Sequence, residues 1–250
     1  MNTAKTTDTE ENGCTLAPPE AADCLIASAQ LESLALKYGT DKGSQYHGYA
    51  AEYGRVLDPL RRGGGPKAVV EIGVCRSDWD GNRHVCPSLA MWRDWFALAG
   101  GTEAAVSVIG LDKCDFGVNG DGLLTLVCDQ GKAEDLAVAR YAVEKGFPGG
   151  VDLIVDDGSH EARHQQLTMK ALWKCLRVGG AYVVEDLNYN PEHEAAIRRV
   201  RGCVETWQAG MKPAWLVDLR REMKQVGRID WVESKVAGDR SAVVLWKARD

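Results

Sequence analysis

The feature that most constrains this chain is a regular alternation of β-rich and helical segments between residues 68 and 186. Apolar stretches rich in β-branched residues cover residues 68–74, 105–112, 123–129, 151–157 and 179–186. Amphipathic segments suited to helices lie between them, at residues 88–99, 133–146 and 161–176. Strands that alternate with helices form a parallel sheet with helices packed on both faces. The sequence therefore predicts a doubly wound α/β fold.

Two further β-rich segments lie near the C-terminus, at residues 228–236 and 241–248, and only the turn AGDR separates them. So short a connection predicts an antiparallel hairpin. Together with the five earlier segments, this gives a mostly parallel, Rossmann-like sheet of seven strands that ends in an antiparallel C-terminal hairpin. Seven strands and their helices fit a chain of 250 residues as one α/β domain with extensions.

The N-terminal quarter of the chain has a different character. Residues 1–22 are polar and are predicted to form a disordered tail. The apolar spacing in residues 23–62 suits a helical N-terminal cap segment, which ends in the linker RRGGGP. The alternation of β-rich and helical segments begins after this linker, so the main Rossmann-like domain is expected over residues 63–250.

Composition argues against several classes of partner. The net charge is −6 and no basic run occurs, so nucleic acid is not expected as a partner. No apolar stretch approaches the ~20 residues of a membrane span, and the N-terminus lacks the pattern of a signal or transit peptide. We therefore expect a cytoplasmic protein. The C-terminal third is rich in Trp, which is enriched at subunit interfaces, so a homo-oligomer is left open.

Acidic side chains follow every predicted parallel strand. In open α/β sheets, ligands bind outside the carboxyl ends of the strands. The residues collected there are Glu71, Gly73, Asp112, Asp129, Asp156, Asp157, His160, Glu185 and Asp186. Asp157 and Ser159 also have an alternative interpretation as caps of the helix at 161–176. That alternative does not explain Glu185 and Asp186, whose strand runs into LNYNP.

Carboxylates that converge on one place repel each other unless one is protonated or a cation binds. Asp157, Glu185 and Asp186 offer only oxygen ligands, which suit Mg²⁺ or Ca²⁺ better than zinc. His160 lies three residues after Asp157 and is suited to act as a general base near neutral pH.

The other strand-end residues suit a nucleoside. Glu71 stands beside the turn at Gly73, and Asp112 is placed to accept hydrogen bonds from two ribose hydroxyls, as acidic residues do in dinucleotide sites. Asp129 is placed to bind an adenine amino group, and Asp156 is grouped with this cofactor-binding set. The ordered series EIGV, GLD, CDQ, DDGSH and VVEDL is a stronger signal than any one of these motifs.

These motifs, with GTDKGSQYHGYAAEYGRVL at residues 39–57, SLAMWRDWF and SAVVLWKA, resemble those of a known family. The resemblance is to the metal-dependent sugar O-methyltransferases of macrolide biosynthesis, of the mycinamicin type, in a superfamily with cephalosporin-hydroxylase-like proteins. It covers residues 35–190 and the last strand. It implies a class I methyltransferase fold, S-adenosylmethionine and Mg²⁺ as cofactors, and a small acceptor with a hydroxyl, such as a sugar. By the same resemblance Asp157, Glu185 and Asp186 bind the metal and His160 is the catalytic base.

The chain departs from that family at residues 75–87, where CRSDWDGNRHVCP replaces a short glycine-rich turn. The insert is open to three interpretations: a surface excursion, a lid over the ligand, or a change that abolishes cofactor binding. An oxidoreductase or hydroxylase on a related scaffold, and a non-catalytic binding protein, remain alternatives. The segment with Asp41, Lys42, His47 and Tyr49 is either a cofactor-side contact, by resemblance, or an amphipathic helix with a solvated polar face.

Overall fold

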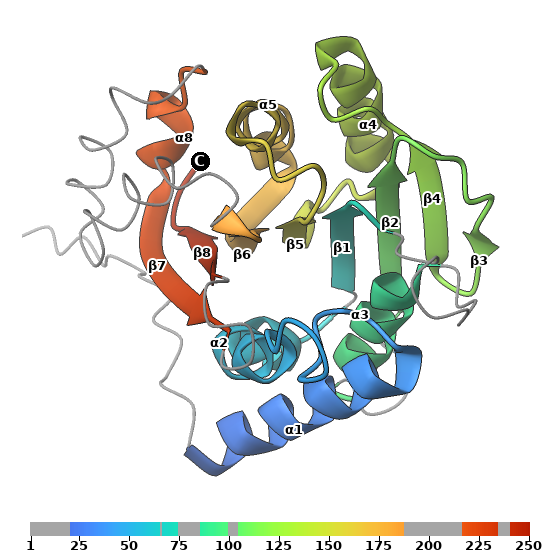
Figure 1. Ribbon diagram of the computed structural model, residues 1–250. Helices are drawn as coiled ribbons and strands as arrows, with labels where there is room; N and C mark the ends of the chain where they lie inside the picture. The colour runs from blue at the N-terminus through green and yellow to red at the C-terminus, as the bar shows by residue number, and fades with distance from the viewer. Residues whose placement is uncertain (1–20, 66, 75–85, 100–104, 188–216, 235–240) are drawn as a thin grey trace, which may run out of the picture.

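The computed structural model describes residues 21–65, 67–74, 86–99, 105–187, 217–234 and 241–250. An eight-stranded sheet in the order β3-β4-β2-β1-β5-β6-β8-β7 runs through the molecule (Figure 1). Its strands are β1 (Lys67–Ile72), β2 (Val106–Asp112), β3 (Asn119–Gly120), β4 (Leu123–Val127), β5 (Val151–Asp156), β6 (Leu176–Val184), β7 (Val226–Glu233) and β8 (Ser241–Lys247). The helices are α1 (Ala21–Tyr38), α2 (Ala50–Arg62), α3 (Pro87–Ala97), α4 (Ala133–Gly146), α5 (Ala162–Leu172), the 3₁₀ helix η1 (Trp173–Cys175) and α8 (Arg220–Met223).

The strand directions confirm the predicted fold class. Strands β4, β2, β1, β5 and β6 are parallel neighbours, and β8 and β7 add the antiparallel C-terminal hairpin at one edge. The eighth strand, β3, was not predicted. It contributes two residues that pair antiparallel with β4, and such a short segment carries no periodic signal in the sequence.

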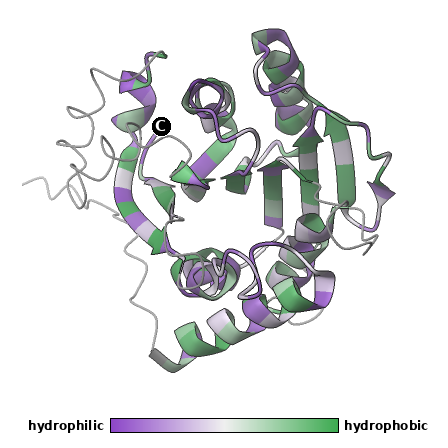
Figure 2. Ribbon diagram, viewed as in Figure 1, coloured by the Kyte–Doolittle hydropathy of each residue, from purple (hydrophilic) through white to green (hydrophobic). Residues whose placement is uncertain are grey.

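Helices cover both faces of the sheet, with α1, α2 and α3 on one side and α4, α5 and α8 on the other (Figure 1). Each layer has its own apolar cluster. Because side chains of a strand alternate between faces, Val69 joins the cluster under α3 and Val70 joins the opposite one. Burial on both faces explains why the central strands are apolar along most of their length, as Figure 2 shows.

The N-terminal helices share their core with the sheet. Tyr53 of α2 stacks near Trp92 of α3, with ring centroids 6.1 Å apart, and the Trp95 indole donates a hydrogen bond to the Ala27 carbonyl of α1. A Cβ on Gly54 would lie 2.6 Å from that same carbonyl oxygen, so glycine allows α1 and α2 to pack closely. The boundary proposed between residues 62 and 63 stays a prediction, since one apolar cluster includes residues from both sides of it.

Several predictions fall on residues that the structure does not describe. The proposed tail lies outside the described residues except for its last two, which begin α1. Residues 75–85 of the insert also lie outside them, as do residues 191–209, for which the sequence predicts a further helix. Among the described residues, no helix combines the length and the apolarity that crossing a bilayer requires.

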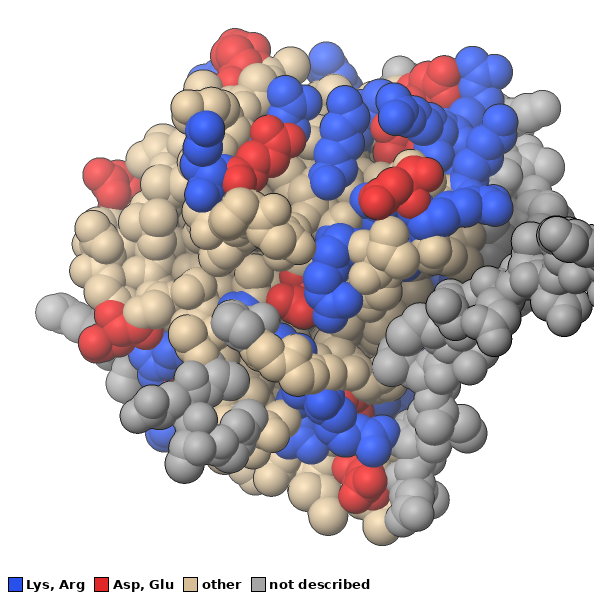
Figure 3. Space-filling model, turned by 180° about the vertical axis from the view of Figure 1, so that it is seen from behind, with Lys and Arg blue, Asp and Glu red and all other residues tan. Residues whose placement is uncertain are grey.

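The rear of the molecule carries interspersed charges of both signs. Figure 3 shows Lys and Arg gathered toward the edge formed by α5 and α8, with acidic residues among them. Ion pairs link acidic and basic residues near α5 and α8: Glu222 lies 2.9 Å from Lys170, and Asp218 lies 2.8 Å from Arg220. The Asp218–Arg220 pair is exposed and contributes little to stability, whereas Glu222 is buried. The expected absence of a nucleic-acid partner stays a prediction, as does the homo-oligomer.

Candidate active site

A cavity of about 430 Å³ opens where β1, β2, β4 and β5 end. The turns that follow these strands form its walls, as expected for an open α/β sheet. Its lining includes five of the residues selected from the sequence: Gly73, Asp112, Asp129, Asp157 and His160.

The first wall is the turn after β1, held by the end of β2. Gly73 has a φ of +79°, which favours glycine, and its amide donates to the Leu111 carbonyl at 2.9 Å. Asp112 accepts hydrogen bonds from the amides of Val74 and Cys114, at 3.2 and 3.0 Å. The Asp112 carboxylate therefore joins the two turns and faces the cavity between them.

The second wall follows β4. The Asp129 carboxylate accepts a hydrogen bond from the Gly131 amide at 2.9 Å, and this bond holds the pKa of Asp129 below its ordinary value. His164 also lines the cavity, and its Nδ1 lies 2.9 Å from the Ser159 hydroxyl. His160 precedes α5 and His164 lies in its first turn, and both residues line the same cavity.

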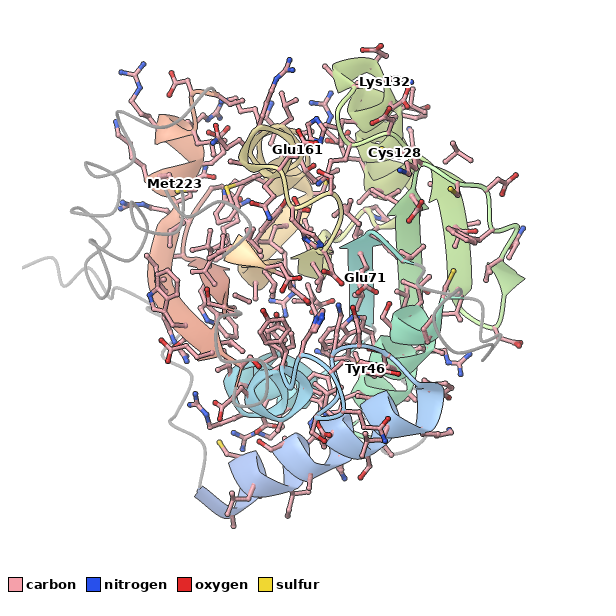
Figure 4. All side chains as sticks on the ribbon, in the orientation of Figure 1. Tyr46, Glu71, Cys128, Lys132, Glu161 and Met223 are labelled. Atoms are coloured by element: carbon pink, nitrogen blue, oxygen red, sulfur yellow. The ribbon has the colours of Figure 1, made fainter. Side chains whose placement is uncertain are left out.

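Glu71 and Asp156, both assigned to cofactor binding, lie beneath the cavity and do not form its lining. Each carboxyl is fully buried, and burial raises the pKa of each to about 7. Asp156 accepts a hydrogen bond from the Gln130 side chain at 2.7 Å, and Gln130 in turn accepts one from the Ser159 amide. Asp156 thus acts on the cavity wall through Gln130, a lining residue that sequence reasoning missed. Figure 4 shows Glu71 on the central strand β1 and Glu161 at the start of α5.

An acidic cluster adjoins the cavity. One ligand atom from each of Asp157, His160 and Asp186 lies within 4.8 Å of the others, and His160 Nε2 is 3.8 Å from Asp186 Oδ2. His160 and Asp186 have φ values of +59° and +52°. Residues other than glycine rarely adopt this left-handed conformation, and such strain concentrates at functional sites. Tyr49 donates a hydrogen bond to Asp186 Oδ1 at 2.8 Å.

Glu185, the third predicted metal ligand, contacts a lysine. The Lys42 ammonium lies 2.6 Å from Asp157 Oδ2, 3.0 Å from Glu185 Oε1 and 3.4 Å from Glu71 Oε1. Burial lowers the pKa of Lys42, but the three carboxylates outweigh it and hold that pKa well above its ordinary value. Lys42 and Tyr49 lie in the segment for which the sequence allowed two interpretations, a cofactor-side contact or an amphipathic helix with a solvated polar face. Both are fully buried at the acidic cluster.

The residues present fit a hard divalent cation. Asp157 and Asp186 bring two carboxylates and His160 an imidazole to one space. Both carboxylate oxygens of Glu185 are buried: Oε1 lies 3.0 Å from the Lys42 ammonium, and Oε2 has no hydrogen-bond donor among the described residues. Buried carboxylate oxygens of this kind are the ligands that Mg²⁺ and Ca²⁺ take in proteins.

Similarity to curated proteins is moderate and partial. No protein-family model matches the chain. The chain is 31% identical over 173 residues to an 8-demethyl-8-(2-methoxy-alpha-L-rhamnosyl)-tetracenomycin-C 3'-O-methyltransferase of Streptomyces olivaceus, covering 67% of this chain and 40% of that protein. It is also 31% identical over 172 residues to the mycinamicin VI 2''-O-methyltransferase of Micromonospora griseorubida, covering 66% of this chain and 38% of that protein. The chain thus spans about two fifths of the length of these relatives.

Among solved structures, the chain is similar to the MycE methyltransferase from the mycinamycin biosynthetic pathway in complex with Mg and SAH. The TM-score is 0.62 and the identity 24%, and the match covers 88% of this chain and 55% of that one. This similarity establishes the class I methyltransferase fold.

Proposed function

Because this chain is a relative of the sugar O-methyltransferases of the mycinamicin and tetracenomycin type and has a class I methyltransferase fold, we propose that it methylates a hydroxyl group. The donor is S-adenosylmethionine, the acceptor is a sugar or a similar small natural product, and Mg²⁺ or another divalent cation binds beside the acceptor. The relatives named for sugar methylation, and the MycE structure with Mg and SAH, support each part of this proposal.

One observation carries the proposal: the nucleoside-sized cavity and the acidic cluster share residues. Asp157 and His160 line the cavity and also belong to the cluster. A methyl donor in the cavity and an acceptor oxygen at the cluster would therefore lie next to each other. Holding two reactants in this way supplies a large part of the rate of a group transfer.

The cavity residues suit the cofactor. Gly73 lines the cavity, and the absence of a side chain lets its turn lie against the backbone of Asp157. Asp112 is placed to accept hydrogen bonds from the ribose hydroxyls, and Asp129 to accept one from the adenine amino group. S-adenosylmethionine supplies a methyl group on a positively charged sulfur, and the transfer neutralises that charge.

The acidic cluster suits the acceptor. Asp157, Asp186 and, after a change of partner, Glu185 would hold the cation, which supplies a lower pKa for a nearby hydroxyl group. His160 is placed to take the hydroxyl proton while the oxygen attacks the methyl carbon, and the carbon–sulfur electron pair stays on sulfur. The Asp186 carboxylate lies 3.8 Å from His160 Nε2.

The test compares two histidines of one cavity. His160→Gln is expected to bind S-adenosylhomocysteine and Mg²⁺ as the wild type does, but to form S-adenosylhomocysteine from a panel of glycosylated acceptors about 10²–10⁴-fold more slowly. His164→Gln, on the same wall but outside the acidic cluster, is expected to change the KM for the cofactor more than kcat.

Calorimetry and a turnover assay on the wild type decide the reaction class. Calorimetry is expected to show micromolar binding of S-adenosylhomocysteine. Turnover is expected to be lost in EDTA and restored by Mg²⁺. A protein that binds NADH tightly and S-adenosylhomocysteine not at all would reject the proposal. Near-full activity of His160→Gln would reject only the role of His160.

A further inference from the structure

The Lys42 ammonium is enclosed by three carboxylates, one of which, Asp157, belongs to the acidic cluster. Its side chain is about 1% exposed, and its Nζ lies within 3.4 Å of Asp157, Glu185 and Glu71. A buried ammonium is costly unless anions surround it, and here they do. Two of its partners, Asp157 and Glu185, are ligands in the proposed cation site.

A divalent cation and this ammonium therefore require the same oxygens. Asp157 can present one oxygen to each, because it contributes both to the ion pair with Lys42 and to the cluster with His160 and Asp186. Glu185 is directed toward Lys42, and it is absent from the group of ligand atoms that converge. A cation bound between Asp157 and Asp186 would lie close to the Lys42 charge and repel it.

Glu71 offers the ammonium another partner. Its carboxylate is 3.4 Å from Lys42 Nζ, farther than the other two, and no part of the proposed cation site uses it. Lys42 lies in a turn segment flanked by Gly39 and Gly48, both with φ of +69°, between α1 and α2. A small shift of the side chain toward Glu71 would release Glu185.

We propose that Lys42 is an internal counter-ion that stands in for the divalent cation. Without metal it neutralises the acidic cluster. When metal binds, the Lys42–Glu185 ion pair is exchanged for contact between Glu185 and the cation, and Lys42 moves onto Glu71. This rests on the cation site of the proposed function. Lys42 is thus a positioning residue that weakens metal affinity and stabilises the metal-free protein.

Substitution of Lys42 tests the competition. Lys42→Met keeps the length of the side chain and removes its charge. The variant is expected to bind Mg²⁺, or Mn²⁺ followed by its EPR signal, at least about tenfold more tightly than the wild type, since the competing charge is gone. Its Tm without metal is expected to be lower, and saturating Mg²⁺ is expected to raise that Tm by more than it raises the wild-type Tm.

Lys67→Met is the matched control, because Lys67 is also a buried lysine beside a carboxylate, at the opposite end of β1 from the acidic cluster. It is expected to leave the Mg²⁺ affinity unchanged. Unchanged or weaker binding of Mg²⁺ by Lys42→Met would overturn the inference, and the wild-type site would stand. Failure of the wild type itself to bind Mg²⁺ or Mn²⁺ would reject the cation site of the proposed function, and this inference with it.

A measurement on the wild type makes the test independent of how well the variant folds. In a protein with ¹⁵N-labelled lysines, the Nζ signal of Lys42 is expected to shift when Mg²⁺ is added, and that of Lys67 is expected to stay. A Lys42 signal that does not respond to saturating Mg²⁺ would contradict the exchange of partners.

Discussion

The backbone of Gly73 lies directly against that of Asp157. A Cβ on Gly73 would be 2.2 Å from the Asp157 carbonyl oxygen and 2.7 Å from the Cα of Gly158. The contact joins the turn after β1, at the cofactor cavity, to the turn after β5, which carries a proposed cation ligand. The distance between the two halves of the site is thus set by a residue without a side chain.

Gly73→Ala is expected to destabilise the protein and to abolish binding of S-adenosylhomocysteine. Any L-residue at this φ costs about 1–2 kcal/mol, and the clash with Asp157 adds about 1–3 kcal/mol more. Gly117→Ala is the control for the cost of the left-handed backbone conformation, since Gly117 has a φ of +62° and open space around it. Urea unfolding that gave equal losses for the two variants would contradict the close contact.

Tyr49→Phe is expected to weaken Mg²⁺ binding about 10–100-fold, because a donor that orients the Asp186 carboxylate is lost. Stability should fall by about 1 kcal/mol. Tyr182→Phe is a matched control, because it removes a buried hydroxyl that donates to Asp156, outside the acidic cluster. Calorimetric titration should give a lower Mg²⁺ affinity for Tyr49→Phe than for Tyr182→Phe. Urea unfolding should give a similar loss of stability for both variants. Equal Mg²⁺ affinities would show that Tyr49 does not act through Asp186.

The grouping of the cavity residues was predictable, because the ends of the parallel strands can be located from the sequence. The apolar segment at 151–157 contains β5, and the segment at 68–74 covers all of β1 except Lys67; the residues after both strands meet at one edge of the sheet. That rule alone was enough to group Gly73, Asp112 and Asp129 around one cavity.

The direction of each side chain was not predictable from strand ends alone. Asp156 and Asp157 are neighbours, as are Glu185 and Asp186, but only Asp156 belongs to a strand, and the φ of Asp186 is +52°, so strand alternation does not fix their directions. Asp157 and Asp186 reach the cluster with His160, whereas Asp156 contacts Gln130 and Glu185 contacts Lys42. The position of Lys42 depends on a turn 115 residues away from Asp157 in the chain, which no local pattern reveals.

Stability should depend on pH through Glu71. Burial raises the pKa of this carboxyl from 4.5 to about 7, so the folded protein holds the proton more tightly than the unfolded chain. In EDTA, the contribution of Glu71 to the free energy of unfolding is expected to be greatest below about pH 4.5 and to fall as the pH rises to about 7. The contribution of Glu71 to this fall is at most about 3 kcal/mol.

Glu71→Gln should flatten this decline, and urea unfolding at a series of pH values measures it. Asp156, whose pKa is also raised to about 7, leaves a residual slope of the same sign. Glu134→Gln, on the exposed surface of α4, removes an equal charge away from the buried carboxylates. A decline as steep in Glu71→Gln as in Glu134→Gln would contradict the assignment to Glu71.

Asp112→Asn tests whether the carboxylate at the end of β2 serves the cofactor. In the wild type its two oxygens accept hydrogen bonds from the amides of Val74 and Cys114. An asparagine offers only one oxygen, so one amide would face an NH₂ group and the ribose would lose its acceptor. We expect affinity for S-adenosylhomocysteine to fall at least about tenfold, since a hydrogen bond to a charged group contributes about 1.5–3 kcal/mol. Asp115→Asn, which alters a carboxylate that accepts from the Gly117 amide in the same loop, should leave that affinity intact. If calorimetry gave the same dissociation constant for Asp112→Asn and the wild type, the cavity would have to bind its nucleoside in another orientation.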